Sequence, residues 1–152
     1  MNEWVDELHA ALLHLSGYMN RPDIDVAFLE RAGVKLDRAL FPLLSRIGLS
    51  APIGVVELGH LAGRDHSTIS RQVTKLEALG LVERQPAADD QRVRLLRPTD
   101  TGAKMLLQLR KARRRLMAEH FKDWTTEDRD QLVELLGRMS NKVRSSRNNG
   151  AG

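Results

Sequence analysis

The chain of 152 residues contains no cysteine. Disulfide bridges, thiolate zinc sites and thiol redox switches are therefore excluded, and a reducing compartment is expected. No apolar run is long enough to span a membrane. Acidic residues at Glu3, Asp6 and Glu7 stand where a secretory leader would carry basic ones. We therefore expect a cytoplasmic protein with no membrane partner.

Signatures of enzyme active sites are also missing. The sequence has no P-loop, no dinucleotide-binding glycine motif and no Ser/His/Asp set in strand phase. Its five histidines include no pair spaced i and i+4, which favours isolated side chains over a metal site. They are His9, His14, His60, His66 and His120. The sequence therefore predicts no enzyme activity, cofactor or metal ion.

Positive charge is concentrated in the middle of the chain. Residues 61–115 hold 13 Lys and Arg against 6 Asp and Glu, whereas residues 1–60 hold 5 against 8 and residues 116–152 hold 6 against 6. The formal net charge is +4 and the sequence pI is about 9.8. A basic excess confined to one segment is the electrostatic footprint of a polyanionic partner. The alternative is an ordinary solvated surface.

Residues 58–84 have the pattern of a helix-turn-helix. A short apolar helix is expected to stop at Gly63, and Asp65 to cap the next helix by accepting its free N–H groups. Gly80 is expected to end that helix in the left-handed conformation. Core positions recur at helical spacing: Ile69, Val73, Leu76 and Leu79. The outward positions carry short donors and long cations: Ser67, Thr68, Ser70, Arg71, Thr74 and Lys75. Such side chains suit base edges and phosphates of DNA.

Two short strands are expected next, at residues 81–84 and 93–97, joined by a polar loop. Arg92 lies at the tip of this hairpin, where it would probe the narrow, negative minor groove of A·T-rich DNA. Asp90 would orient Arg92 through a charge-assisted hydrogen bond. Arg94, on the second strand, is a further candidate contact. Without the neighbouring motif, ordinary turn residues would be the better interpretation of Asp90 and Arg92.

These residues carry a resemblance to a known family. Asp90-x-Arg92 followed by Thr99-Asp100-Thr101-Gly102 is similar to the signature of the MarR family of transcriptional regulators, in which Asp-x-Arg precedes a Leu-Thr-x-x-Gly segment at this spacing. Residues 67–71 and 76–82 resemble the family's recognition helix and the strand after it. Three positions depart from the pattern: Pro98 replaces the usual leucine, Gln72 an apolar residue and Arg64 an aliphatic turn residue.

The resemblance implies an obligate homodimer that acts as a repressor or activator. The terminal helices would form the dimer, and an effector cleft would lie between the dimer helices and the DNA-binding lobe. The expected fold is mainly α with a two- to three-stranded β wing. Its expected parts are a helical dimerisation region (1–35 and 103–146), a winged helix-turn-helix lobe (36–102) and a disordered tail (147–152).

Hydrophobic periodicity places the remaining helices. A heptad seam predicts a first helix that the Arg21-Pro22-Asp23 segment ends: Met1, Val5, Leu8, Leu12, Leu15 and Met19. A second helix, with Asp37 as its cap, a bend at Pro42 and an end at Gly48, is expected to carry Leu36, Leu40, Leu43, Leu44 and Ile47.

Two capped helices are expected to follow the wing. Thr99 would cap a long helix that reaches Phe121, and Thr125 would start the last helix with Asp128 as its capping-box partner. The last helix carries a second apolar seam within residues 132–143, so the two ends of the chain are expected to intertwine across a two-fold axis. The polar residues from Ser145 onward are expected to be disordered.

An effector cleft would be lined by some of six residues: Leu12, Leu15, Arg38, Leu40, Leu44 and Met105. An apolar pocket with few polar anchors favours a small aromatic or amphipathic anion. The alternative is that these residues pack as core. We therefore predict a ligand-responsive DNA-binding regulator, a homodimeric repressor at a pseudo-palindromic operator. The alternative function is an architectural or partner-binding winged helix without operator specificity.

Overall fold

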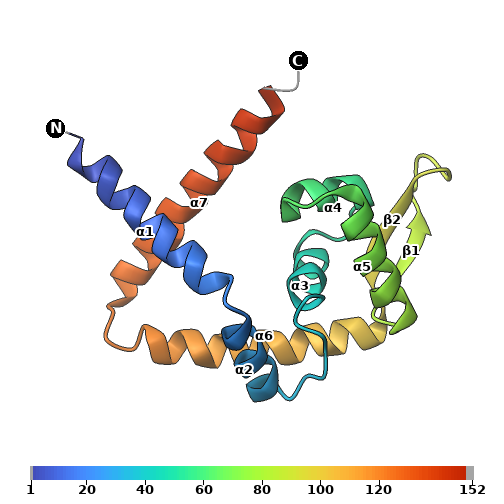
Figure 1. Ribbon diagram of the computed structural model, residues 1–152, viewed down its shortest axis with the longest axis horizontal. Coiled ribbons are helices and arrows are strands. Elements are labelled where there is room, and N and C mark those ends of the chain that lie inside the picture. The colour runs from blue at the N-terminus through green and yellow to red at the C-terminus, as the bar shows by residue number, and fades with distance from the viewer. Residues whose placement is uncertain (1, 150–152) are drawn as a thin grey trace. The chain divides into compact units, whose positions relative to one another are not determined.

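The computed structural model describes residues 2–149 of the chain. This range contains seven helices and one antiparallel hairpin (Figure 1). The chain forms two compact units, one ending at Ala112 and the other beginning at Arg113. The elements are α1 (Glu3–Met19), α2 (Pro22–Ala32), α3 (Phe41–Ser50), α4 (Val55–Ala62), α5 (His66–Ala78), β1 (Val82–Pro86), β2 (Arg94–Pro98), α6 (Asp100–His120) and α7 (Thr126–Asn149). The mainly helical fold with a small wing is thus confirmed.

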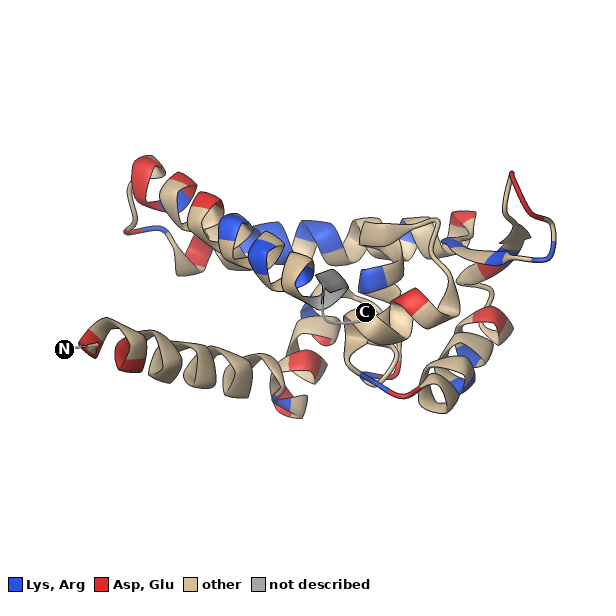
Figure 2. Ribbon diagram, turned by 90° about the horizontal axis from the view of Figure 1, so that it is seen from above, with Lys and Arg blue, Asp and Glu red and all other residues tan. Residues whose placement is uncertain are grey.

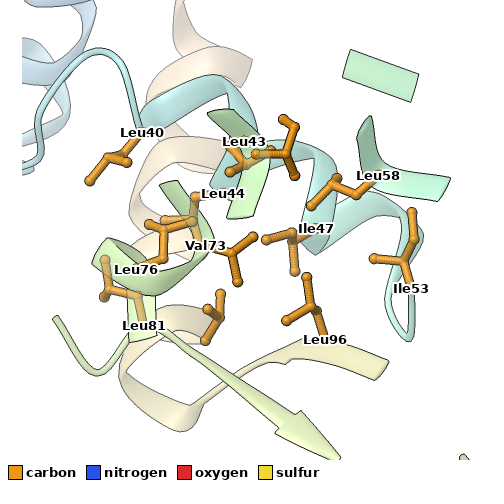
Figure 3. Packing of buried hydrophobic residues seen from close by; sticks show 12 residues of the cluster. Leu40, Leu43, Leu44, Ile47, Ile53, Leu58, Val73, Leu76, Leu81 and Leu96 are labelled. Atoms are coloured by element: carbon orange, nitrogen blue, oxygen red, sulfur yellow. The ribbon is translucent and has the colours of Figure 1, made fainter. Parts of the chain in front are cut away.

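The main core lies where α3, α4, α5 and the hairpin meet. Side chains of Leu44, Ile47 and Val73 from α3 and α5 point toward Leu96 of β2 (Figure 3), and all four are fully buried. Ile53, between α3 and α4, exchanges two backbone hydrogen bonds with Leu96, at 3.1 and 2.8 Å. The wing therefore has two strands and one additional bridge, which ties the hairpin to the core.

A smaller core cluster joins α2 to α6. Leu29 and Val34 are buried together with Leu109, and the rings of Phe28 and Phe41 lie 5.4 Å apart beside them. Helix α2 was not expected from the sequence, which marked residues 21–23 only as a break. Pro22 ends α1 and also starts α2, because proline at the first helical position lacks only an N–H group that would be unpaired there.

Helix α3 differs from its expectation at both ends. It begins at Phe41, and Pro42 lies in its first turn, where it causes no bend. The Asp37 carboxylate accepts a hydrogen bond from the Ala39 N–H (2.8 Å) in the preceding turn and does not cap the helix. Gly48 lies inside α3, where a Cβ atom would come within 2.8 Å of the Leu106 side chain. The glycine therefore allows close packing of α3 against α6.

Other helix ends follow the sequence closely. Gly63 and Gly80 adopt the left-handed conformation, with φ of 64° and 70°. The Thr99 hydroxyl accepts from the Gly102 N–H (3.1 Å), and the Thr125 hydroxyl accepts from the Asp128 N–H (3.1 Å), so both threonines are confirmed as caps. The reciprocal bond of the capping box, from the Thr125 N–H to the Asp128 carboxylate, stays a prediction. Helix α7 continues to Asn149, which corrects the expected disorder from residue 145, and residues 150–152 of the expected tail lie outside the described range.

The boundary between the two units lies within α6. It falls ten residues after the expected edge of the DNA-binding lobe, and residues 2–35 group with that lobe. The functional division into a dimerisation region and a DNA-binding lobe stays a prediction. No helix within residues 2–149 combines the length and the apolarity needed to cross a lipid bilayer.

Candidate nucleic-acid interface

The N-terminus of α5 is organised by Asp65. Its carboxylate accepts hydrogen bonds from the Ser67 hydroxyl (2.6 Å) and from the Thr68 N–H (3.3 Å). These bonds, that from Ser67 foremost, lower the pKa of Asp65 to about 2 from its ordinary 3.8. The predicted cap is therefore confirmed, and it fixes the direction in which the first turn of α5 leaves the preceding loop.

The outward face of α5 carries the predicted polar side chains. Arg71, Thr74 and Lys75 are exposed, while Ile69 and Val73 on the opposite face are fully buried. The Thr74 hydroxyl donates to the Ser70 carbonyl (2.9 Å), and Arg71 Nη2 lies 3.5 Å from the Thr68 hydroxyl. A hydroxyl that donates its proton in such a bond can still accept, so Thr74 remains an acceptor, while the exposed Arg71 and Lys75 remain donors. Thr68 and Ser70 are half-buried.

One position on α5 was assigned to the wrong face. Leu79, predicted to lie in the core, is 56% exposed. It forms the C-cap of α5, where the chain already turns toward Gly80, so the helical periodicity no longer determines its direction. Leu81, two residues later, is buried instead.

The wing tip presents a single arginine to solvent. The Arg92 side chain is 92% exposed, and its Nε and Nη2 atoms donate to the two carboxylate oxygens of Asp90 at 3.2 and 3.4 Å. Asp90 also accepts from the Arg92 backbone N–H at 3.0 Å. The Arg92 guanidinium lowers the pKa of Asp90. Acidic and basic residues lie together in this loop, at the right edge of Figure 2. The predicted orienting bond is confirmed, and groove contact stays a prediction.

The hairpin forms nearly where expected: both strands begin one residue later, β1 ends two residues later and β2 one residue later. Pairing of Val82 with Pro98 and of Pro86 with Arg94 sets its register. Arg94 is exposed at the start of β2, beside the loop that bears Arg92. The structure therefore brings the wing candidates Asp90, Arg92 and Arg94 together in one loop and its edge.

Two contacts of α5 were missed by sequence analysis. The Gln72 side chain donates to the Ala39 carbonyl (3.3 Å), so its polar group is satisfied by the chain segment before α3. Glu77 Oε1 accepts from Arg84 Nε at 2.9 Å, which joins α5 to β1. The signal for the second contact was present, because strand alternation places Arg84 on the same face as buried Val82.

The six effector candidates are not assembled in one described cavity. Leu40 and Leu44 are buried in the main core, so the alternative of simple core packing holds for them. Met105 is half-buried against both clusters, Arg38 is exposed, and Leu12 and Leu15 lie on α1, which has no buried residue. Two cavities in the structure are lined by other residues. One, of 580 Å³, is lined by residues 83 and 97–101. The other, of 490 Å³, is lined by residues between 123 and 135.

Comparison with known proteins agrees with this geometry. The model of the MarR family matches residues 36–93. The HTH-type transcriptional regulator YxaD of Bacillus subtilis is 32% identical over 111 residues, which cover 73% of this chain and 78% of YxaD. The chain belongs to the MarR family. Its fold is that of the DNA-binding winged helix, and its family is one of transcriptional regulators.

Solved structures of MarR-family proteins support the same assignment. A MarR protein from Peptoclostridium difficile is 25% identical, with a TM-score of 0.67 over 89% of this chain and 88% of that one. The transcriptional regulator BldR from Sulfolobus solfataricus is 27% identical, with a TM-score of 0.65 over 91% of this chain and 97% of that one. The predicted family and fold are thus confirmed.

Proposed function

We propose that this MarR-family regulator is a cytoplasmic homodimeric repressor that binds a pseudo-palindromic operator, with α5 in the major groove and the wing tip in the adjacent minor groove. One observation carries the proposal: the exposed cations of α5 and the 92% exposed Arg92 belong to one compact unit with a shared core. Two rigidly connected basic elements suit neighbouring grooves of one duplex.

The side chains of α5 divide between two roles. Arg71 has the planar donors that pair with guanine in the major groove, and Ser67, Thr68, Ser70 and Thr74 offer short donors and acceptors around it. Lys75, a point charge one helical turn beyond Arg71, suits the phosphate backbone. Asp90, Arg92 and Arg94 form the minor-groove part of the surface.

The homodimer is supported by exposed apolar residues at both ends of the chain. Helix α1 buries no side chain, although Trp4, Leu13 and Met19 are apolar and largely exposed. On α7, Val133 and Val143 are likewise exposed. Apolar surface of this extent normally marks a protein interface. A two-fold symmetric dimer would cover both helices and place two α5 helices about one DNA turn apart.

The charges of α7 indicate how two copies would meet. Residues 126–136 hold four acidic residues against one arginine, whereas residues 137–149 hold four basic residues and no acidic one. Antiparallel pairing of α7 with α7 of a second copy would place opposite charges together, and parallel pairing would place like charges together. Antiparallel pairing is also the arrangement that a two-fold axis perpendicular to the helices produces.

Release of DNA by a small molecule completes the proposal. Leu12, Leu15 and Arg38, none of them buried, are available to line a cleft with Met105, and Arg38 would supply the cation for an aromatic or amphipathic anion. A ligand shifts the DNA affinity only if it prefers a dimer whose α5 helices are wrongly spaced. A panel of phenolic and lipophilic acids, screened for changes in melting temperature and operator affinity, tests this part.

The test of operator binding uses the full chain and the DNA upstream of its own coding region. Fluorescence anisotropy is measured with and without excess random DNA, and light scattering gives the mass of the free protein. We expect a dimer whose affinity for one palindromic segment exceeds that for random DNA by at least a thousandfold, about the lower bound for specific regulators. Equal affinities would support an architectural winged helix, and a monomer would refute the dimer. In vitro transcription from that promoter then separates repression from activation.

A further inference from the structure

The ion pair between Glu77 and Arg84 links the two elements that the proposed function places in different grooves. Glu77 lies in the last turn of α5, and Arg84 is the third residue of β1. Their Oε1 and Nε atoms are 2.9 Å apart, and the side chains are 33% and 35% exposed. Within the described residues, no other side-chain hydrogen bond joins α5 to the hairpin.

The position of Arg84 is unusual for a charged residue. In the hairpin register it pairs with Leu96, and the alternation of a strand puts it on the same face as Val82. Both Val82 and Leu96 are buried in the core. The Arg84 side chain itself stays exposed at the edge of this core, and the hydrogen bond from its Nε to Glu77 holds the guanidinium against α5.

We propose that Glu77 and Arg84 are positioning residues for DNA recognition: they fix the direction of the wing relative to α5 and thereby allow both elements to contact one operator. This inference rests on the proposed function. The shared core and the Ile53–Leu96 bridge anchor the base of the wing, and the ion pair limits the motion that remains. A change of direction at β1 moves Arg92 at the tip further than it moves residues at the base. Residual motion of the wing would have to be ordered during binding, and this ordering lowers affinity.

The hairpin contains a second ion pair that serves as a matched control. Glu83 Oε1 and Arg97 Nε lie 2.7 Å apart, on the other face of the hairpin. This pair joins β1 to β2 and does not involve α5. Glu77→Gln and Glu83→Gln therefore remove the same charge and one ion pair each, but only Glu77→Gln weakens an ion pair between α5 and the wing.

The sign of the effect separates positioning from simple electrostatics. Loss of a negative charge near the DNA-binding surface should by itself raise affinity for every DNA sequence. For Glu77→Gln we expect operator affinity to fall, by up to about fivefold for a partly exposed pair, with no fall on random DNA. In the Arg92→Ala background the same substitution should cause no further loss, because the wing contact is already gone. Glu83→Gln should leave operator affinity unchanged or raise it.

A distance measurement tests the geometry without DNA. Because the chain has no cysteine, Ala78→Cys and Gln91→Cys provide two unique sites for spin labels on α5 and the wing loop. We expect the distance distribution between the labels to be narrow in the otherwise unchanged protein and in Glu83→Gln, and broad in Glu77→Gln. The double variant Glu77→Arg with Arg84→Glu exchanges the two charges and should restore the narrow distribution. If Glu77→Gln does not fold, this double variant still tests whether the ion pair holds the wing.

The outcomes distinguish this inference from the proposed function. If the distance distribution is equally narrow in Glu77→Gln and Glu83→Gln, or if both variants gain operator affinity alike, the positioning role is refuted. A different result is a broader distribution in Glu77→Gln together with no specific binding to any DNA. The ion pair would then still restrict the wing relative to α5. Operator binding, and with it the role of the pair in DNA recognition, would be refuted.

Discussion

Arg92→Ala tests the wing directly, because it changes DNA contact without changing the fold. The side chain is 92% exposed and bonds only to Asp90 in the same loop, so the melting temperature should stay at the wild-type value. In the proposed dimer each wing loses one cation, so two cations fewer at the DNA should reduce the slope of log affinity against log salt by about 1.8. Between 50 and 200 mM salt, the ratio of wild-type to variant affinity should therefore shrink about twelvefold.

The assay is a salt titration of operator binding by fluorescence anisotropy, on two operators that differ only in their flanking sequence. The loss should be larger on the operator flanked by A·T runs, because their narrow minor groove concentrates negative potential. Arg92→Lys provides the matched control, since it keeps the charge and hence the salt slope but loses the bidentate bond to Asp90. Asp90→Ala should give a weaker form of the Arg92→Ala defect.

One result would refute the reasoning. If Arg92→Ala binds both operators as tightly as the wild type at every salt concentration, the wing makes no contact, and α5 is the sole DNA-reading element. A loss of affinity accompanied by a lower melting temperature would instead show that the loop supports the fold, contrary to its exposure.

Three further predictions concern readout and stability. Arg71→Ala should weaken operator binding by about 1–3 kcal/mol and relax discrimination at one or two base pairs. Lys75→Ala should weaken binding to operator and to random DNA alike. If both variants lose the same affinity for random DNA, Arg71 is a phosphate contact. Because folding lowers the pKa of Asp65 to about 2, its contribution to stability is present above about pH 4 and is lost as the pH falls toward 2. The difference in urea midpoint between wild type and Asp65→Asn should therefore vanish over that range, and a constant difference would contradict the cap. Leu96→Ala, at a fully buried position, should lower the free energy of unfolding by about 2–5 kcal/mol, while Val93→Ala, 45% exposed nearby, should change it by less than about 0.5 kcal/mol. Chemical denaturation measures both, and similar losses would show that the hairpin is not anchored through Leu96.

Local chemistry in the sequence determined the helix-turn-helix and the wing. Asp65 caps α5 and Asp90 bonds to Arg92 because each partner is only two or three residues away, so the sequence alone places the atoms together. Gly63 and Gly80 stop their helices for an equally local reason, the left-handed backbone. Gly80, Asp90 and Arg92 are also among the residues that carry the resemblance to the MarR family, which explains why family and fold were predicted correctly.

The tertiary structure decided what depends on distant partners. Leu40 and Leu44 suited a cleft as well as a core by composition, and only the packing of α3 against α5 and β2 placed them in the core. Gly48 was interpreted as a helix end because its actual constraint, the side chain of Leu106 on α6, lies far away in sequence. The bond between Glu77 and Arg84 likewise exists because the turn after α5 folds β1 back onto the helix. The hydrophobic pattern of a sequence indicates which residues are buried. Which other residues they pack against depends on the fold as a whole.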